Sequence, residues 1–237
     1  MNTIDINGKA YPFILQFKNI KNVHLKVYPE QTVLLSVPLD TPNEWIDRFL
    51  ISKQNWLCKQ MGLYASTAAI EKEPHTRNGS SNRILGVQKT VRVLYASHRS
   101  IENIDRFLTV YTPEAENQAA VDRQMNAWWQ KNSKMYFKEV LDRLYPIIGK
   151  HGIAKPTIVV KKMKTLWGSC SPRKNRINLN FYLYKASVPC IDYVILHELI
   201  HFLYPKHNKD FYDFITIHMP DWEQRKRTLD YETVLGV

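Results

Sequence analysis

The chain has 237 residues, of which 44% are hydrophobic and 23% are charged. Such a composition excludes a disordered chain and is sufficient for one large or two small globular domains with buried cores. The excess of 33 Lys and Arg over 22 Asp and Glu residues gives a net charge of +11, which favours an anionic partner such as a nucleotide, a nucleic acid or an acidic peptide.

Membrane and secretion signals are absent from the sequence. No segment approaches the roughly 20 apolar residues that cross a membrane, and the first residues, MNTID, lack the basic start and apolar core of a signal peptide. We therefore expect a cytoplasmic protein that does not associate with membranes. Its three cysteines, Cys58, Cys170 and Cys190, form no close pair, so we expect reduced thiols rather than disulfides or a cysteine-based zinc site.

The chain begins with a strand pattern. Alternation of apolar and polar residues over 23–27 and 32–37 predicts two short strands, joined by a turn at 29–31. Residues 43–61 then predict a helix, because large apolar side chains recur on one side of it.

Small and polar residues dominate 65–83, which predicts a mobile connection. The strand pattern resumes over 91–95 and 107–111. These elements predict a β-rich N-terminal module at residues 1–115, and no internal repeat is evident.

The remainder, residues 116–237, mixes helices and strands. A long helical pattern over 119–148 carries an apolar and aromatic stripe, which indicates a core helix. Strands are predicted over 157–162 and 176–184, and a helix over 210–217. Together with the motif that follows, these elements predict an α+β catalytic domain.

The most informative feature is the His-Glu-Leu-Ile-His motif at residues 197–201. His197 and His201 project from one face of a helix about one turn apart, so they can share one metal ion. Glu198 is left free to deprotonate a water molecule, which is the general-base role in zinc hydrolases of this motif.

The surroundings of the motif favour a helix and a third ligand. Ser187 is a plausible N-cap, Pro189 fits the first turn and Asp192 complements the helix dipole. Pro205 predicts the end of the helix. Because a catalytic zinc usually has three protein ligands and an open position for water, we expect the third ligand beyond the helix end and prefer His207.

Two alternatives remain open at this site. In a gluzincin arrangement a glutamate on a later helix would be the third ligand, and after the motif only Glu223 and Glu232 are available. The other alternative is that His197 and His201 are core histidines and His207 is an ordinary surface residue.

Three segments precede the motif in a specific order. They are Thr165-Leu166-Trp167-Gly168-Ser169-Cys170, then Arg176-Ile177-Asn178-Leu179-Asn180, and then Asp192-Tyr193-Val194-Ile195-Leu196. Together with the segments at 23–27 and 33–38, they resemble the YgjP-like metallopeptidase family, relatives of the SprT-like zincins, over nearly the whole chain. The family usually has a basic residue before Trp167, where this chain has Leu166.

The resemblance implies an α+β fold with a zincin-like metallopeptidase domain around the active-site helix. It also implies that His197, His201 and His207 bind Zn²⁺ and that Glu198 is the general base. The reaction stays open, because a nucleotide-hydrolase activity has also been attached to this family and a fold does not fix a function.

Three functions therefore compete. The first is a zinc-dependent metallopeptidase for a peptide or protein substrate, which would bind by strand addition near Trp167, with Tyr204 or His218 as oxyanion donor. The second is a metal-dependent nucleotide phosphoanhydride hydrolase, a nucleoside triphosphate pyrophosphatase. The third is a DNA-associated zincin-like protein whose metal only stabilises the fold. Histidine ligands suit zinc better than magnesium, so we favour peptide hydrolysis.

Basic residues near the motifs would form an electropositive approach to the metal if they share one face, and are otherwise a solvated surface. They are Lys161, Lys162, Lys164, Arg173, Lys174, Arg176, Lys206, Lys209, Arg225, Lys226 and Arg227. No nucleic-acid-binding motif is recognisable, and the sequence predicts no particular oligomeric state.

Overall fold

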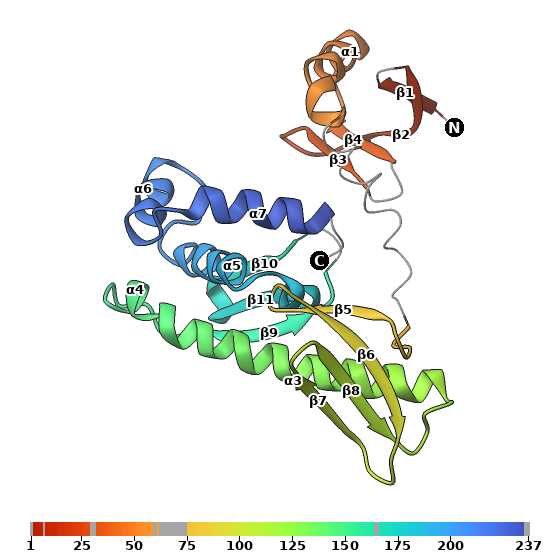
Figure 1. Ribbon diagram of the computed structural model, residues 1–237. Helices are drawn as coiled ribbons and strands as arrows, with labels where there is room; N and C mark the ends of the chain where they lie inside the picture. The colour runs from red at the N-terminus through yellow and green to blue at the C-terminus, as the bar shows by residue number, and fades with distance from the viewer. Residues whose placement is uncertain are drawn as a thin grey trace. The chain divides into compact units, whose positions relative to one another are not determined.

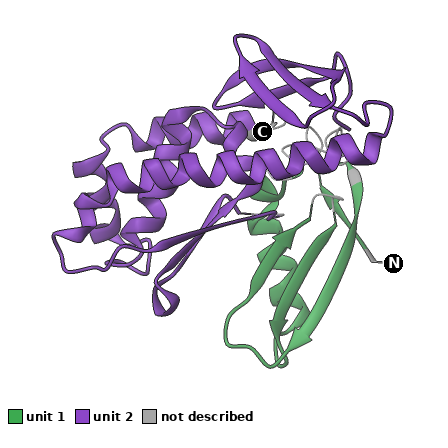
Figure 2. Cartoon of the chain, turned by 90° about the horizontal axis from the view of Figure 1, so that it is seen from below, with its two compact units in different colours: residues 1–73, 233–236 green, residues 74–232, 237 purple. Residues whose placement is uncertain are grey.

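The structure is a computed structural model that describes residues 2–6, 8–28, 32–58, 61, 75–163 and 166–234. The turn predicted at 29–31 lies outside these ranges, as do residues 65–74 of the predicted connection, Lys164 and Thr165. The chain divides into two compact units (Figure 2). Unit 1 contains residues 1–73 and 233–236, and unit 2 contains residues 74–232 and 237.

Unit 1 is built around a four-stranded sheet in the order β1-β2-β4-β3 (Figure 1). Its strands are β1 Asn2–Ile6, β2 Lys9–Lys18, β3 His24–Val27 and β4 Val33–Pro38. β2 and β4 pair in parallel, between two antiparallel pairs. Alternation along β4 buries Val33, Leu35 and Val37, and helix α1 (Asn43–Ser52) adds Ile46 to the core around Leu35 and Val37.

Unit 2 begins with a second four-stranded sheet that repeats this topology. Its order is β5-β6-β8-β7, with a parallel pair between two antiparallel pairs. The strands are β5 Ser81–Ile84, β6 Val87–Tyr95, β7 Ser100–Ile104 and β8 Phe107–Thr112. The two sheets share the order in which their strands pair. Different residues can form the same pairing order if apolar and polar residues alternate in the same way. The repeat is therefore not visible in the sequence.

Helix α3 (Gln118–Leu144) is the long element of unit 2 (Figure 1). Asn117 caps its start by accepting a hydrogen bond from the Ala120 N–H at 3.2 Å. Its buried side chains, among them Trp129 and Phe137, belong to a core that also includes residues of α4, β9, β11, α5, α6 and α7. The short helix α4 (Pro146–Gly149) follows.

A three-stranded sheet in the order β10-β11-β9 comes next. The strands are β9 Thr157–Lys161, β10 Gly168–Ser171 and β11 Arg176–Asn180. The central β11 pairs in parallel with β9 and antiparallel with β10. β10 is therefore an edge strand of this sheet, and it packs against α5.

Three helices complete unit 2: α5 Val188–Ile200, α6 Lys209–His218 and α7 Trp222–Val234. α5 is buried along nearly its whole length, between α3, α6 and β10. A helix that is buried on all sides is mostly apolar. We therefore expect each polar residue of α5 to have a specific polar partner.

The predicted α+β class is confirmed. Five predicted strands correspond to β3, β4, β6, β8 and β9, whereas the strand predicted at 176–184 ends at Asn180 and continues as the 3-10 helix Phe181–Lys185. The helix predicted at 43–61 is interrupted, because α1 ends at Ser52 and residues 54–58 are helical again after a turn. β1, β2, β5, β7, β10 and α7 were not predicted.

The end of the predicted mobile connection is ordered, which corrects that prediction for residues 75–83. Asp122 of α3 accepts a hydrogen bond from the Thr76 N–H at 2.8 Å, and Ser81–Ile84 is strand β5. The domain boundary expected at residue 115 falls inside unit 2, between β8 and α3. No helix in the described ranges is long and apolar enough to cross a membrane, and the cytoplasmic location stays a prediction.

Candidate metal centre

The start of α5 is held by side chains from two other elements. Ser187 stands at the N-cap, as predicted, but its hydroxyl contacts Cys190 Sγ at 3.1 Å and caps no backbone N–H. Instead, Glu232 of α7 accepts the Ser187 N–H at 3.0 Å through Oε2, and its Oε1 accepts from Arg83 of β5 at 2.8 Å. The backbone that leads into the motif is therefore fixed.

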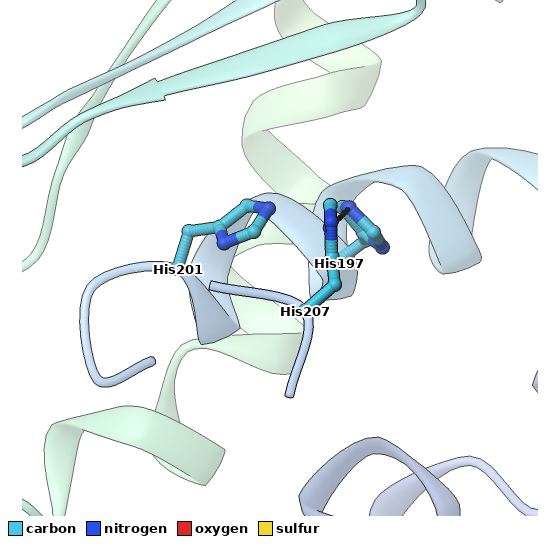
Figure 3. A group of neighbouring side chains, drawn as sticks. All are labelled: His197, His201 and His207. Carbon is cyan, nitrogen blue, oxygen red and sulfur yellow. Dashed lines mark hydrogen bonds between the residues drawn. The ribbon is translucent and has the colours of Figure 1, made fainter. Parts of the chain in front are cut away.

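The three predicted histidines converge. His197 and His201 project from the end of α5 and His207 from the segment before α6, and their rings lie close together (Figure 3). One ring nitrogen of each lies within 4.8 Å of the others, and this is the one group of three or more potential metal ligands among the described residues. The Nε2 atoms of His197 and His207 are 2.9 Å apart.

His201 is oriented by a backbone carbonyl. Its Nδ1 lies 3.0 Å from the Tyr204 oxygen, which is the geometry of an N–H donated to a carbonyl. Such a contact on one ring nitrogen fixes the tautomer and leaves the other nitrogen, Nε2, as the ligand atom. The turn after α5 therefore orients the ring of His201.

Helix α6 supports the other side of the group. The ring of Phe211, which is fully buried, lies 5.0, 4.9 and 4.8 Å from the rings of His197, His201 and His207, measured between centroids. Asn208 caps α6 by accepting the Phe211 N–H at 3.2 Å, so the residue next to His207 is fixed to the helix that carries this ring.

The surroundings keep His197 and His207 neutral. Burial lowers the pKa of His197 to about 3, assisted by the charges of His201, His207 and Lys226. The pKa of His207 is lowered by burial and by the charges of His201 and Lys226. A neutral imidazole retains the lone pair that a metal ion needs, so the surroundings favour ligand chemistry over the imidazolium form.

Glu198 is buried against the edge strand β10 and is only 7% exposed. Burial raises its pKa to about 7, while a hydrogen bond from the Cys170 backbone N–H acts in the opposite direction. A Cβ added to Gly168 would lie 2.7 Å from the Glu198 Cγ and 2.8 Å from Oε1. Gly168 and Cys170 are two residues apart and therefore lie on the same side of the strand. Both residues are next to the Glu198 carboxyl group.

Asn180 of β11 holds the segment that leads into β10. Its side-chain amide donates to the carbonyl oxygens of Met163 at 2.8 Å and Leu166 at 2.9 Å. Its backbone N–H donates to the carbonyl oxygen of Trp167 at 2.8 Å. The side chain is only 5% exposed. A buried amide that satisfies backbone carbonyls in this way fixes the residues that carry them, here Met163 and Leu166.

The family model for the YgjP-like metallopeptidase domain matches residues 21–232. The chain belongs to the YgjP-like metallopeptidase family. Among solved structures, it is similar to the metallopeptidase zymogen of Methanocaldococcus jannaschii jannalysin, at 22% identity and a TM-score of 0.35, over 40% of this chain and 95% of that one. No curated protein matches the chain.

In this YgjP-like chain, Asp192 anchors α5 to two other helices. It is 8% exposed and accepts hydrogen bonds from Arg143 of α3, at 2.7 Å from Nη2 and 3.2 Å from Nη1. Arg225 of α7 lies 3.8 Å away on its other side. Asp192 lies beyond the first turn of α5, so these two arginines, rather than the helix dipole of the prediction, are its main partners.

Other residues singled out in the sequence lie elsewhere. The rings of Tyr204 and His218 both pack on Phe214, at 5.6 and 4.6 Å between centroids, and neither belongs to the histidine group. Glu232 is occupied by Arg83 and Ser187, and Glu223 is exposed in the first turn of α7. Neither glutamate joins the histidines, so the gluzincin alternative finds no support here.

The basic residues differ in their surroundings. Lys209 and Arg225 pair with carboxylates one turn away on their own helices, and Lys164 lies outside the described ranges. Lys226 is the one whose charge acts on two of the histidines. The sequence analysis included Lys226 among the basic residues but did not distinguish it from the rest.

Sequence reasoning missed the residues that support the group. Phe211 carries a readable signal, since it lies four residues after His207, which is one helical turn. Gly168 carries another, because an isolated glycine in a strand marks a close approach of another group. The contact of Gly168 with Glu198 joins parts of the chain that only the fold brings together.

Proposed function

We propose that this metallopeptidase-family protein is a zinc-dependent peptidase in which His197, His201 and His207 hold Zn²⁺ and Glu198 is the general base. The observation that carries the proposal is the convergence of three imidazoles next to a carboxyl group that is buried against an edge strand. A structural zinc site typically has four protein ligands and no open position for water. Such a site does not require a general base such as Glu198.

The three nitrogens fit zinc in number and type, and they lie within 4.8 Å of one another. Zinc binds imidazole nitrogen at about 2.0–2.1 Å, so two ligands of a tetrahedral ion lie roughly 3.4 Å apart. The His197 and His207 Nε2 atoms, 2.9 Å apart, need to separate by only about half an ångström, and His207 lies on a segment outside the helices. Three nitrogen ligands suit zinc better than magnesium, which prefers oxygen.

A bound zinc ion would polarise the scissile carbonyl and acidify a water molecule. Glu198 would accept the proton of that water and deliver it to the leaving amine, as general acid–base catalysis requires. In the metal-free protein the pKa of Glu198 is raised to about 7 by burial, so this carboxyl group is able both to take up and to release a proton near neutral pH.

The edge strand β10 is the proposed binding site for the peptide backbone. β10 pairs with β11 on one side only within its sheet, so its other side can add an extended peptide by backbone hydrogen bonds. Since Gly168 and Cys170 of this strand contact Glu198, a peptide paired with β10 would pass next to the general base.

Metal content and turnover in three proteins test the proposal. The wild type should hold about one equivalent of zinc and cleave members of a mixed peptide library. His207→Ala should lose most of the metal. Glu198→Gln should keep the metal and lose about 10²- to 10⁴-fold in kcat, the usual contribution of a general base. Full activity of Glu198→Gln would contradict the assigned mechanism.

The same proteins discriminate between peptide chemistry and the two other functions. Cleavage of nucleoside triphosphates by the wild type, lost in Glu198→Gln and without peptide cleavage, would favour the nucleotide hydrolase. Salt-dependent DNA binding without any hydrolysis would favour the DNA-associated protein, because phosphate contacts weaken as salt rises.

A further inference from the structure

Three aromatic side chains form a continuous series of ring contacts between His207 and His197, next to α6 and α7. Tyr212 stacks on His207 with centroids 6.2 Å apart, and on Trp222 at 5.4 Å. Trp222 stacks on Tyr193 at 6.4 Å, and Tyr193 meets the edge of His197 at 5.7 Å. We refer to Tyr193, Tyr212 and Trp222 as the aromatic wall.

The aromatic wall has a fixed inner part and an accessible outer part. Tyr193 is 7% exposed, whereas Tyr212 is 41% exposed. Trp222 packs against the core of unit 2, and its Nε1 donates to Thr216 Oγ1 at 3.0 Å. The aromatic wall contacts His197 and His207 directly. A stacked aromatic surface of this kind binds the apolar part of a side chain well.

Lys226 lies next to the aromatic wall. It follows Trp222 by four residues on α7 and therefore shares its side of the helix. Its charge acts on both His197 and His207, and its side chain is exposed. No ion pair within 4.0 Å involves Lys226 in the part of the chain that the structure describes, although Asp230 follows one turn later.

We propose that Lys226 and the aromatic wall bind a carboxylate of the peptide substrate beside the scissile bond. The inference rests on the proposed peptidase function and specifies its substrate class. The ammonium group would pair with the carboxylate, while Tyr212 and Trp222 would pack on the carbon atoms that carry it. The same charge would repel a substrate with Lys or Arg at that position, so selectivity has an attractive and a repulsive part.

A single carboxylate matches this site better than a phosphate chain. Phosphate groups carry more charge and are typically bound by several cations or by bidentate arginine. The neighbouring Arg225 is already engaged by Asp192 and Asp221. Lys226 carries a single positive charge, which balances one carboxylate, and the nearby Asp230, whose charge acts on Tyr193, adds to the repulsion of a multiply charged phosphate chain.

Cleavage sites in a peptide library test the inference. The zinc-loaded wild type, Lys226→Gln, Lys226→Glu and Arg227→Gln digest the same library, and mass spectrometry locates the cleaved bonds. Arg227→Gln is the matched control, because it removes one exposed charge from the next residue of the same helix. We expect Asp and Glu to be enriched within two residues of the bond for the wild type and the control, lost for Lys226→Gln, and replaced by Lys and Arg for Lys226→Glu.

Kinetics on one cleaved peptide quantify the effect. Changing its acidic residue from Glu to Gln should reduce kcat/KM about three- to tenfold in the wild type, the range for one partly exposed charged hydrogen bond, and not at all in Lys226→Gln. If amidation of the C-terminus removes the preference instead, the carboxylate is the terminal one. Equal enrichment in the wild type and Lys226→Gln would overturn the inference while leaving the peptidase function intact.

A binding measurement separates the two proposals. Zinc-loaded Glu198→Gln is titrated with the Glu and the Gln form of one acetylated peptide, with and without Lys226→Gln. Tighter binding of the Glu form that depends on Lys226 supports the inference without any turnover. Equal affinities for the two forms overturn it. Absence of cleavage by the wild type, in contrast, counts only against the peptidase function.

Discussion

Gly168 lies so close to Glu198 that a β-carbon on the glycine would stand 2.7 Å from the Cγ and 2.8 Å from Oε1 of the glutamate. Non-bonded carbon atoms rest at about 3.5–4.0 Å, so any side chain at position 168 would displace Glu198 or the strand. The Trp-Gly-Ser-Cys segment and the His-Glu-Leu-Ile-His motif are thereby parts of one site.

We expect Gly168→Ala to reduce kcat by about 10²-fold or more, because a displacement of about 1 Å at a reacting group has that effect. Zinc content should stay near the wild-type value, since the histidines do not touch Gly168. Metal analysis and kcat on one peptide measure the two quantities. The overpacking should also lower the free energy of unfolding by about 1–3 kcal/mol.

Cys170→Ala is the matched control for this substitution. Only the backbone N–H of Cys170 serves Glu198, and burial raises the pKa of its thiol to about 12, so the thiol is neither nucleophile nor metal ligand at neutral pH. The variant should keep wild-type turnover within about threefold. Similar losses in both variants would mean that β10 is sensitive to any change, and the specific role of Gly168 would be lost.

Glu198→Gln should change the pH dependence of stability in the metal-free protein. The pKa of Glu198 is raised from 4.5 to about 7 in the folded state. Between these values the folded protein holds a proton that the unfolded chain releases, so stability falls as the pH rises from 4.5 to 7. At pH 8 the neutral glutamine should therefore be more stable than the wild type, by up to about 3 kcal/mol.

Urea denaturation of the chelator-treated proteins between pH 4 and pH 8 measures this gain. It should shrink as the pH falls toward 4, where both side chains are neutral. The exposed Glu223→Gln should give no pH-dependent gain. A gain of Glu198→Gln that stays constant with pH would have to come from packing, and would contradict the raised pKa.

Asp192→Asn should destabilise the fold through the loss of the charge that joins α5 to Arg143 and Arg225. The aspartate is buried while Arg143 is half exposed, so we expect a loss of about 1–3 kcal/mol. Asp213→Asn, which removes the partner of exposed Lys209 within α6, should cost much less, because solvent screens this surface pair. Chemical denaturation compares the two, and equal losses would remove the anchoring role.

Glu232→Gln should affect stability and leave the metal in place. Glu232 is 5% exposed and joins Ser187 at the start of α5 to Arg83. We expect a loss of about 1–2 kcal/mol from the weakened cap and ion pair, together with an unchanged zinc content. A variant that loses its zinc while staying folded would revive the gluzincin alternative, with Glu232 as a ligand.

The sequence predicted the histidine group because its spacing is local. His197 and His201 are one turn apart on a helix, and the helix end leaves few residues for a third ligand. Glu198 was predicted for the same reason. Lys226, in contrast, approaches the histidines only because α7 folds back toward α5, and no periodicity in the sequence encodes that return.

Strand prediction succeeded where one face is buried and failed where it is not. β4 and β8 bury several residues each, which makes the alternation readable. β10 contains glycine, two serines and a cysteine, and it is a strand because β11 pairs with it. β5 and β7 are largely polar, and helix α7 has few apolar residues, so their patterns are weak even though the core includes Leu229 of α7.

The third histidine lies outside the helix that carries the other two, so a metal ion held by all three would tie the start of α6 to the end of α5. α5 itself is held by Asp192 and Glu232, which need no metal. Removal of the ion should therefore loosen the short segment around His207 and leave the helices folded. In amide hydrogen exchange, the metal-dependent protection would be local to residues 202–212, and an inactive apoprotein would regain its site as soon as zinc returns.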